Sequence, residues 1–183
     1  MPEPAPPSSV RLTDARPAVV LIGMPGCGKS TVAAPLAARL GVPLIDPDRR
    51  IEAGEGRALG AVSAGLDRAG FLDLEDRYNR AVPAGPAVIA PGGSVIYCEP
   101  AMRRYRTFAA AVWLDVPVPV LETRLGCLKT RAVVIAPGAT LHDLAAERRP
   151  LLERWADLHV HAADRPPGEV ADEIAAALRP ASV

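Results

Sequence analysis

The stretch from Gly23 to Thr31 constrains this chain more than any other, because it reads G-x-x-x-x-G-K-S-T. Residues 18–22 just before it are continuously apolar, as expected for a strand buried on both faces of a parallel sheet. After the motif, apolar residues recur every four positions, at Val32, Leu36 and Leu40. Gly41 then stands where a helix would end. The pattern therefore predicts a strand, a glycine-rich turn and a helix, in that order.

This arrangement is typical of a phosphate-binding loop. Its glycines let backbone N–H groups turn inward, and the N-terminus of the helix adds partial positive charge. Lys29 can reach the outer phosphates, and the Ser30 hydroxyl can ligate Mg²⁺. The sequence predicts that the chain binds a nucleoside triphosphate with Mg²⁺. The residues expected to contact the nucleotide here are Gly26, Cys27, Gly28, Lys29, Ser30 and Thr31.

Composition excludes several other classes of protein. The 21 basic residues equal the 21 acidic ones, which argues against a basic groove for nucleic acid and against a polybasic membrane anchor. No apolar run approaches the ~20 residues of a membrane span. The 3 cysteines form no C-x-x-C pair, so we expect a reducing, cytoplasmic setting rather than a disulfide framework.

The N-terminus is rich in proline and lacks the apolar core of a signal peptide. We expect residues 1–16 to form a disordered tail. Residues 17–183 are then the length of one domain with a substantial core.

Two carboxylates follow the second expected strand, residues 42–45. Ligands of open parallel sheets lie at the carboxyl ends of the strands, so Asp46 and Asp48 can face the γ-phosphate. We interpret Asp46 as holding the metal, through water, and Asp48 as the base or orienter of the attacking hydroxyl. The alternative is that these residues only cap a helix or form a turn, for which Asp is equally favoured.

The rest of the chain alternates between strand and helix patterns. Further strands are expected at residues 88–90, 111–115 and 158–162, and further helices at residues 117–124, 141–155 and 168–178. Residues 49–82 read as the acceptor segment, made of helical pieces interrupted by Gly54, Gly56, Gly65 and Gly70. Residues 126–140 lack periodicity and are expected to form a lid. The alternation predicts an α/β domain with a parallel sheet.

The order and spacing of these motifs resemble the shikimate kinase family of small phosphate-loop kinases over residues 17–178. The matching pieces are the phosphate loop, the pair Asp46 and Asp48, the dipeptide at Gly56 and Arg57, the turn with Gly92 and Gly93, Arg131 in the lid, and Arg148 two residues before Pro150. The resemblance implies a three-layer fold with a five-stranded parallel sheet in the order 2-3-1-4-5. It also implies a monomer that phosphorylates shikimate to shikimate 3-phosphate with ATP, a step of aromatic amino acid biosynthesis.

The resemblance also implies roles for individual residues. Asp48 would contact the ring hydroxyls of the acceptor, and Arg148 would pair with its carboxylate. The glycine turn at Gly92 and Gly93 would complete the acceptor site. Arg131 would act from the lid on the transferring phosphate, and Arg124 would lie on the nucleotide side.

The acceptor half departs from the family pattern. The family has an F-R-x-x-E stretch on the acceptor helix, and residues 71–75 here read Phe-Leu-Asp-Leu-Glu. Leu72 therefore stands where the family has a second carboxylate-binding arginine, and Pro91 replaces the first glycine of the turn. Arg68, one helical turn before Leu72, could partly substitute. Two alternatives follow: a kinase whose cyclitol or sugar acceptor lacks the carboxylate, or a nucleotide-binding protein without useful catalysis. The intact Lys29 and Asp48 argue against the second.

Overall fold

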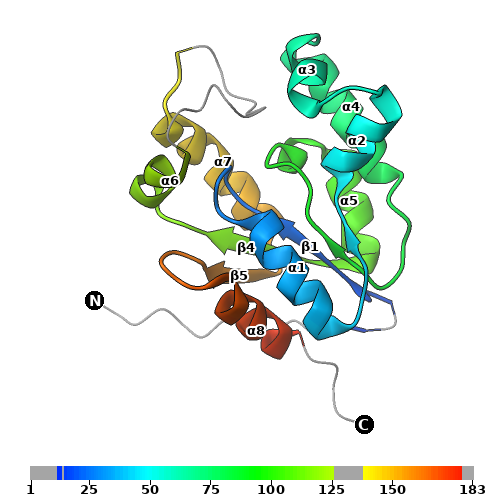
Figure 1. Ribbon diagram of the computed structural model, residues 1–183, viewed down its shortest axis with the longest axis vertical. Helices are drawn as coiled ribbons and strands as arrows, with labels where there is room; N and C mark the ends of the chain where they lie inside the picture. The colour runs from blue at the N-terminus through cyan, green and yellow to red at the C-terminus, as the bar shows by residue number, and fades with distance from the viewer. Residues whose placement is uncertain (1–11, 14, 126–137, 179–183) are drawn as a thin grey trace.

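The computed structural model of this chain describes residues 12, 13, 15–125 and 138–178. A five-stranded sheet runs through the domain in the order β2-β3-β1-β4-β5, and every neighbouring pair is parallel. The predicted fold class and strand order are therefore confirmed (Figure 1). The strands are β1 (Ala18–Ile22), β2 (Leu44–Ile45), β3 (Val88–Ile89), β4 (Ala109–Asp115) and β5 (Leu158–His161).

Eight helices of the described residues surround the sheet. They are α1 (Lys29–Leu40), α2 (Pro47–Glu55), α3 (Leu59–Ala64), α4 (Arg68–Arg80), α5 (Glu99–Phe108), α6 (Val118–Leu125), α7 (Leu141–Trp155) and α8 (Pro167–Ala177). A short 3₁₀ helix, η1 (Val95–Tyr97), follows β3.

Alternation along β1 explains the three layers. Val19 and Leu21 belong to a core that includes buried residues of α1 and α8, whereas Val20 and Ile22 belong to a core that includes residues of α5 and α7. All five residues of β1 are 0–1% exposed, as expected for a central strand covered on both faces. Helices α2, α3 and α4 gather beside β2 and β3 and pack around a small core of their own (Figure 1).

The predicted boundaries shift in physically simple ways. β4 begins at Ala109, two residues earlier than expected, because it pairs with β1 over the whole length of β1. Gly56 and Gly65 end helices, as expected of glycine, but Gly54 and Gly70 lie inside α2 and α4. Helix α5 lies in a part of the chain for which no element was expected.

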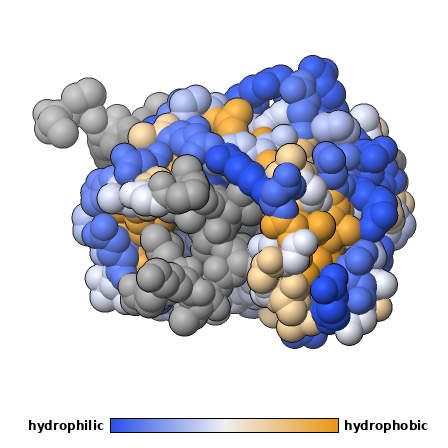
Figure 2. Space-filling model, turned by 90° about the horizontal axis from the view of Figure 1, so that it is seen from above, coloured by the Kyte–Doolittle hydropathy of each residue, from blue (hydrophilic) through white to orange (hydrophobic). Residues whose placement is uncertain are grey.

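Contacts with the domain begin before residue 17. The backbone N–H of Leu12 donates to the carbonyl of Leu178, and the Arg16 guanidinium donates to the carbonyl of Ala109 and to Asp157. Seen from above, the described surface shows separate apolar patches bordered by hydrophilic residues (Figure 2). None of the helices in the described ranges has the length and apolar character needed to cross a membrane.

Candidate active site

The turn after β1 depends on glycine at two positions. At Gly23 the φ angle is +148°, and a Cβ there would lie 2.8 Å from the carbonyl oxygen of Leu114. Gly28 is the N-cap of α1 at φ +98°, a conformation that L side chains rarely adopt. The Lys29 ammonium donates to the carbonyls of Gly23 and Met24 at 3.0 and 3.2 Å. The loop thus holds this cation at the N-terminus of α1, where phosphates are favoured.

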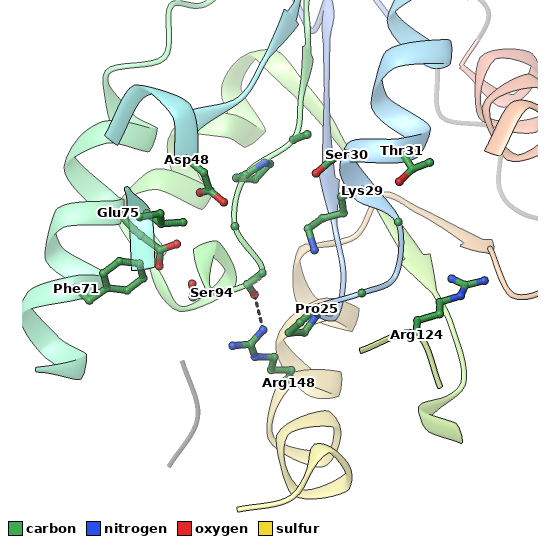
Figure 3. Close-up of a pocket in the computed structure, with 17 residues that line it drawn as sticks. Pro25, Lys29, Ser30, Thr31, Asp48, Phe71, Glu75, Ser94, Arg124 and Arg148 are labelled. Carbon is green, nitrogen blue, oxygen red and sulfur yellow. Dashed lines mark hydrogen bonds between the residues drawn. The ribbon is translucent and has the colours of Figure 1, made fainter. Parts of the chain in front are cut away.

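A cavity of about 360 Å³ opens beside this loop (Figure 3). One side carries the loop residues, and the other carries side chains from α2, α4 and α7. Of the residues predicted for the site, it is lined by Gly26, Gly28, Lys29, Ser30, Thr31, Asp48, Gly92, Gly93, Arg124 and Arg148. The fold therefore brings together in one cavity residues from widely separated parts of the chain.

Asp46 and Asp48 differ in what they do in the structure: Asp46 caps a helix, and Asp48 faces the cavity. Asp46 is the N-cap of α2, and its Oδ1 accepts from the backbone N–H groups of Asp48 and Arg49 at 3.0 and 3.3 Å. It does not line the cavity, so its contact with a metal stays a prediction. Asp48 follows the N1 proline of the helix, Pro47, and does line the cavity.

The carboxyl of Asp48 is electrostatically unusual. Burial raises its pKa to about 6, and the neighbouring Asp46 adds to the rise, whereas Lys29 and the N–H of Gly92 oppose it. Its Oδ1 is buried and has no hydrogen-bond partner among the described residues. A carboxylate with an open oxygen and a pKa close to neutral suits a group that accepts a proton from a hydroxyl.

Arg148 lines the part of the cavity predicted to bind the acceptor. Its side chain reaches from α7 and is 1% exposed. Nη1 donates to the Gly93 carbonyl at 2.9 Å (Figure 3). Nε donates to the Tyr97 hydroxyl at 3.2 Å. A Cβ on residue 93 would lie 2.9 Å from Nη1, so the guanidinium approaches this closely only because residue 93 is glycine.

Arg124 marks the opposite end of the cavity. It also lines a neighbouring hollow that contains Thr31, Cys27, Arg165 and Pro167. A nucleotide whose phosphates lie on the loop can extend its base in this direction. The predicted lid residue Arg131 lies outside the described residues.

The structure separates Leu72 and Arg68 from the cavity lining. Leu72 is half-buried on α4, and its carbonyl accepts from the Cys98 thiol at 3.5 Å. Arg68 pairs with Glu147 at 2.7 Å and lies over the Tyr97 ring at 5.0 Å. Neither side chain lines the cavity, so Arg68 does not take the place that Leu72 leaves there.

Several lining residues were not predicted as site residues, among them Phe71, Glu75 and Ser94. Phe71 and Glu75 are four residues apart on α4 and therefore share one helix face. That spacing was a usable signal. The family's F-R-x-x-E pattern, which residues 71–75 match in part, was a second signal, but only its arginine position was used.

Mg²⁺ fits the loop side of this cavity. The Ser30 hydroxyl supplies an oxygen next to Lys29, and Mg²⁺ commonly takes few protein ligands beside substrate phosphates and water. The described residues contain no group of three His, Cys, Asp or Glu side chains that could hold a metal by themselves.

Comparison with known proteins agrees with this geometry. The family model for shikimate kinase matches residues 25–179. The chain belongs to the shikimate kinase family. A shikimate kinase of Rhodopseudomonas palustris is 36% identical over 87% of this chain and 80% of the relative. One of Corynebacterium efficiens is also 36% identical, over 87% of this chain and 95% of the relative.

Solved structures of family members superpose on the same fold. The shikimate kinase of Acinetobacter baumannii in complex with shikimate has a TM-score of 0.80 at 26% identity, covering 88% of this chain and 92% of that one. The shikimate kinase of Aquifex aeolicus has a TM-score of 0.76 at 28% identity, covering 87% and 95%. These family members thus share the fold over most of the chain.

Proposed function

We propose that this chain transfers the γ-phosphate of ATP to a hydroxyl of shikimate, forming shikimate 3-phosphate. The observation that carries the proposal is the single cavity that joins the phosphate loop to Asp48 and Arg148. Enzymes catalyse phosphoryl transfer mainly by positioning the reactants and by stabilising charge. The residues that line this cavity can do both.

On the nucleotide side, Lys29 offers its ammonium to the outer phosphates. Ser30 would ligate Mg²⁺ directly, and Asp46 would do so through water. When bound, Mg²⁺ neutralises charge on the β- and γ-phosphates. Arg124 borders the hollow in which the nucleoside would lie, and Arg131 is proposed to reach the transferring phosphate from the lid.

On the acceptor side, Asp48 orients the attacking hydroxyl and accepts its proton. Arg148 carries the positive charge that a shikimate carboxylate requires, although Gly93 and Tyr97 already take two of its N–H groups. The turn at Gly92 and Gly93 brings backbone within reach of the ring. The equal numbers of basic and acidic residues, 21 of each, support a cytoplasmic enzyme that acts without nucleic acid, and we propose that it is a monomer.

A specific observation favours a second candidate, a neutral cyclitol or sugar acceptor. Leu72 replaces the second carboxylate-binding arginine of the family pattern, and Arg68 is engaged with Glu147 outside the cavity. An acceptor without a carboxylate has no need of that second arginine.

The test is the initial rate of ADP formation with ATP, Mg²⁺ and one acceptor at a time. The panel contains shikimate, quinate, gluconate and myo-inositol, with a no-acceptor reaction as the blank. We expect shikimate to give the highest kcat/KM of the four acceptors. A higher value for myo-inositol would transfer the assignment to the second candidate, and no rate above the blank with any acceptor would overturn both.

A further inference from the structure

Tyr97 contacts the acceptor side of the site from outside the cavity, because it is not among the residues that line it. It ends the short helix η1, which follows the glycine turn, and it is partly buried. Its hydroxyl accepts the Nε–H of Arg148 at 3.2 Å, and the central carbon of the Arg148 guanidinium lies 5.2 Å from the centre of its ring. Tyr97 thus holds the cation that would recognise a carboxylate.

Two hydrogen bonds fix the plane of the Arg148 guanidinium. Nε donates to Tyr97, and Nη1 donates to the Gly93 carbonyl where the side chain reaches from α7 toward the turn (Figure 3). The guanidinium is a rigid planar fork, so two contacts at different nitrogens determine the direction that the whole group faces. A carboxylate is bound best when it meets two N–H groups of this fork at once. The orientation of the plane therefore affects how well a carboxylate binds.

An ion pair between α4 and α7 holds Tyr97 in turn. Arg68, at the start of α4, donates to Glu147 of α7 at 2.7 Å, and its guanidinium lies 5.0 Å from the centre of the Tyr97 ring. Hydrogen bonds from Arg68 and from the Tyr97 hydroxyl lower the pKa of Glu147, whereas burial opposes them. Tyr97 is thus in contact with two guanidinium groups and bonded to a carboxylate.

The hydroxyl of Tyr97 joins the ion pair to Arg148. A tyrosine hydroxyl can accept one hydrogen bond while it donates another. Burial raises the pKa of Tyr97, so the hydroxyl keeps its proton at neutral pH and can donate to Glu147 while it accepts from Arg148. Glu147 and Arg68 are exposed, whereas Arg148 is buried. Phenylalanine at residue 97 could keep the ring contacts but would make neither hydrogen bond.

We propose that Tyr97 is a positioning residue for the acceptor carboxylate: it orients Arg148, and the ion pair of Arg68 with Glu147 keeps Tyr97 in place. Arg68 then supports carboxylate binding without entering the cavity. Holding a binding group in its bound orientation improves affinity, because less conformational freedom is lost when the ligand binds. This inference rests on the proposed function, because it requires an acceptor with a carboxylate.

The test compares Tyr97→Phe with Tyr78→Phe, which is a matched control. Tyr78 is also partly buried, its hydroxyl donates to a glutamate, Glu55, at 3.0 Å, and the Arg77 guanidinium lies 5.3 Å from its ring centre. It lies on the side of α4 that packs against α2, outside the cavity. For each variant, kcat, KM for ATP and KM for shikimate are measured. The methyl ester of shikimate, which has no carboxylate charge, is measured as an alternative acceptor or as a competitor of shikimate.

We expect Tyr97→Phe to raise KM for shikimate about threefold to tenfold, because Arg148 loses a hydrogen bond that orients it. KM for ATP and kcat should stay nearly unchanged, as expected when a contact remote from the reacting hydroxyl is weakened. Affinity for the methyl ester should change by less than about twofold, since it lacks the charge that Arg148 binds. Tyr78→Phe should leave all of these values close to those of the wild type.

Glu147→Gln tests the ion pair without altering the packing of Tyr97. Glu147 is exposed, and Glu55→Gln is its control, because Glu55 makes the equivalent contacts with Arg77 and Tyr78. We expect Glu147→Gln to raise KM for shikimate about twofold to fivefold, the effect of an exposed ion pair, and Glu55→Gln to leave it unchanged. An unchanged KM for shikimate in Glu147→Gln would overturn the part assigned to the ion pair.

An unchanged KM for shikimate in Tyr97→Phe would overturn the positioning role of Tyr97. So would an equal rise in Tyr78→Phe, or an equal loss of affinity for the methyl ester, because either would indicate a general structural effect. These results leave the kinase function standing, since the wild type still phosphorylates shikimate. Failure of the wild type to phosphorylate shikimate would instead overturn the proposed function and this inference with it.

Discussion

At the scale of single residues, Lys29 is the group on which nucleotide chemistry depends most. Lys29→Ala removes the only ammonium that the loop holds over the phosphate site within the described residues. We expect turnover to fall at least about 10²–10³-fold, the usual loss when one positioned charge-stabilising group is removed. The thermal melting curve should stay close to that of the wild type. A variant that folds and keeps a tenth of wild-type turnover would contradict this role.

Asp48 should govern turnover and its dependence on pH. Asp48→Asn keeps the shape of the side chain but cannot accept a proton, so we expect kcat to fall about 10²–10⁴-fold with KM for ATP nearly unchanged. In the wild type, kcat/KM for the acceptor should fall as the pH drops below about 6, because Asp48 is then protonated. Steady-state rates from pH 5 to 8 check both statements, and near-normal turnover of Asp48→Asn would refute them.

The substitution Leu72→Arg should have opposite effects on activity with the two classes of acceptor. If shikimate is the acceptor, Leu72→Arg should lower its KM by about tenfold or more, because a charge-assisted hydrogen bond is worth ~1.5–3 kcal/mol. Combining Leu72→Arg with Asp73→Ala should lower KM for shikimate further, because it removes a nearby negative charge. If the acceptor is neutral, the added charge should instead lower activity. Unchanged kinetics on every acceptor would show that residue 72 does not reach the site.

At the scale of elements, the packing of α2 on α4 depends on Gly54. A Cβ at residue 54 would lie 2.0 Å from the Tyr78 hydroxyl, which itself bonds to Glu55 at 3.0 Å. Gly54→Ala must therefore displace the Tyr78 ring. We expect a net loss of about 1–2 kcal/mol in the free energy of unfolding, even after the gain in helix propensity.

Gly60 provides the matched control for this prediction. It lies in α3, and a Cβ there would have no atom within 4 Å. Gly60→Ala should stabilise the protein by about 0.5–1 kcal/mol through helix propensity. Urea unfolding of both variants measures the difference. Equal shifts of the urea midpoints of Gly54→Ala and Gly60→Ala would contradict the role of Gly54 in the packing of α2 on α4.

The elements that the sequence predicted well are those with a strong periodic or apolar pattern. Strand β1 and helix α7 have the predicted bounds, and the sheet has the predicted order. β2 and β3 pair over only two residues each, because the chain turns at once into α2 or the glycine turn. Gly54 and Gly70 were misjudged as interruptions. Gly54 lies where α2 packs closely against Tyr78, and Gly70 lies in the first turn of α4, where its N–H donates to the N-cap residue Asp67.

At the scale of the whole molecule, the sequence predicted the nucleotide half of the site better than the acceptor half. The phosphate loop is contiguous, so its geometry follows from one motif. The acceptor half is assembled from α2, α4, the turn after β3 and α7, and only the fold shows which face of each helix reaches the cavity. Glu75 was not singled out for that reason, and Leu72 is not among the residues that line the cavity.

We propose that a phosphoryl group passes from ATP to shikimate within one cavity. The most direct measurement is ³¹P NMR of the wild-type protein with ATP, Mg²⁺ and shikimate, with the product mass determined in parallel. We expect a phosphate monoester of shikimate, esterified at its 3-hydroxyl, whose concentration rises in step with that of ADP. It should be absent when Lys29→Ala replaces the wild type. ADP accompanied only by inorganic phosphate, or no reaction while another polyol is phosphorylated, would contradict it.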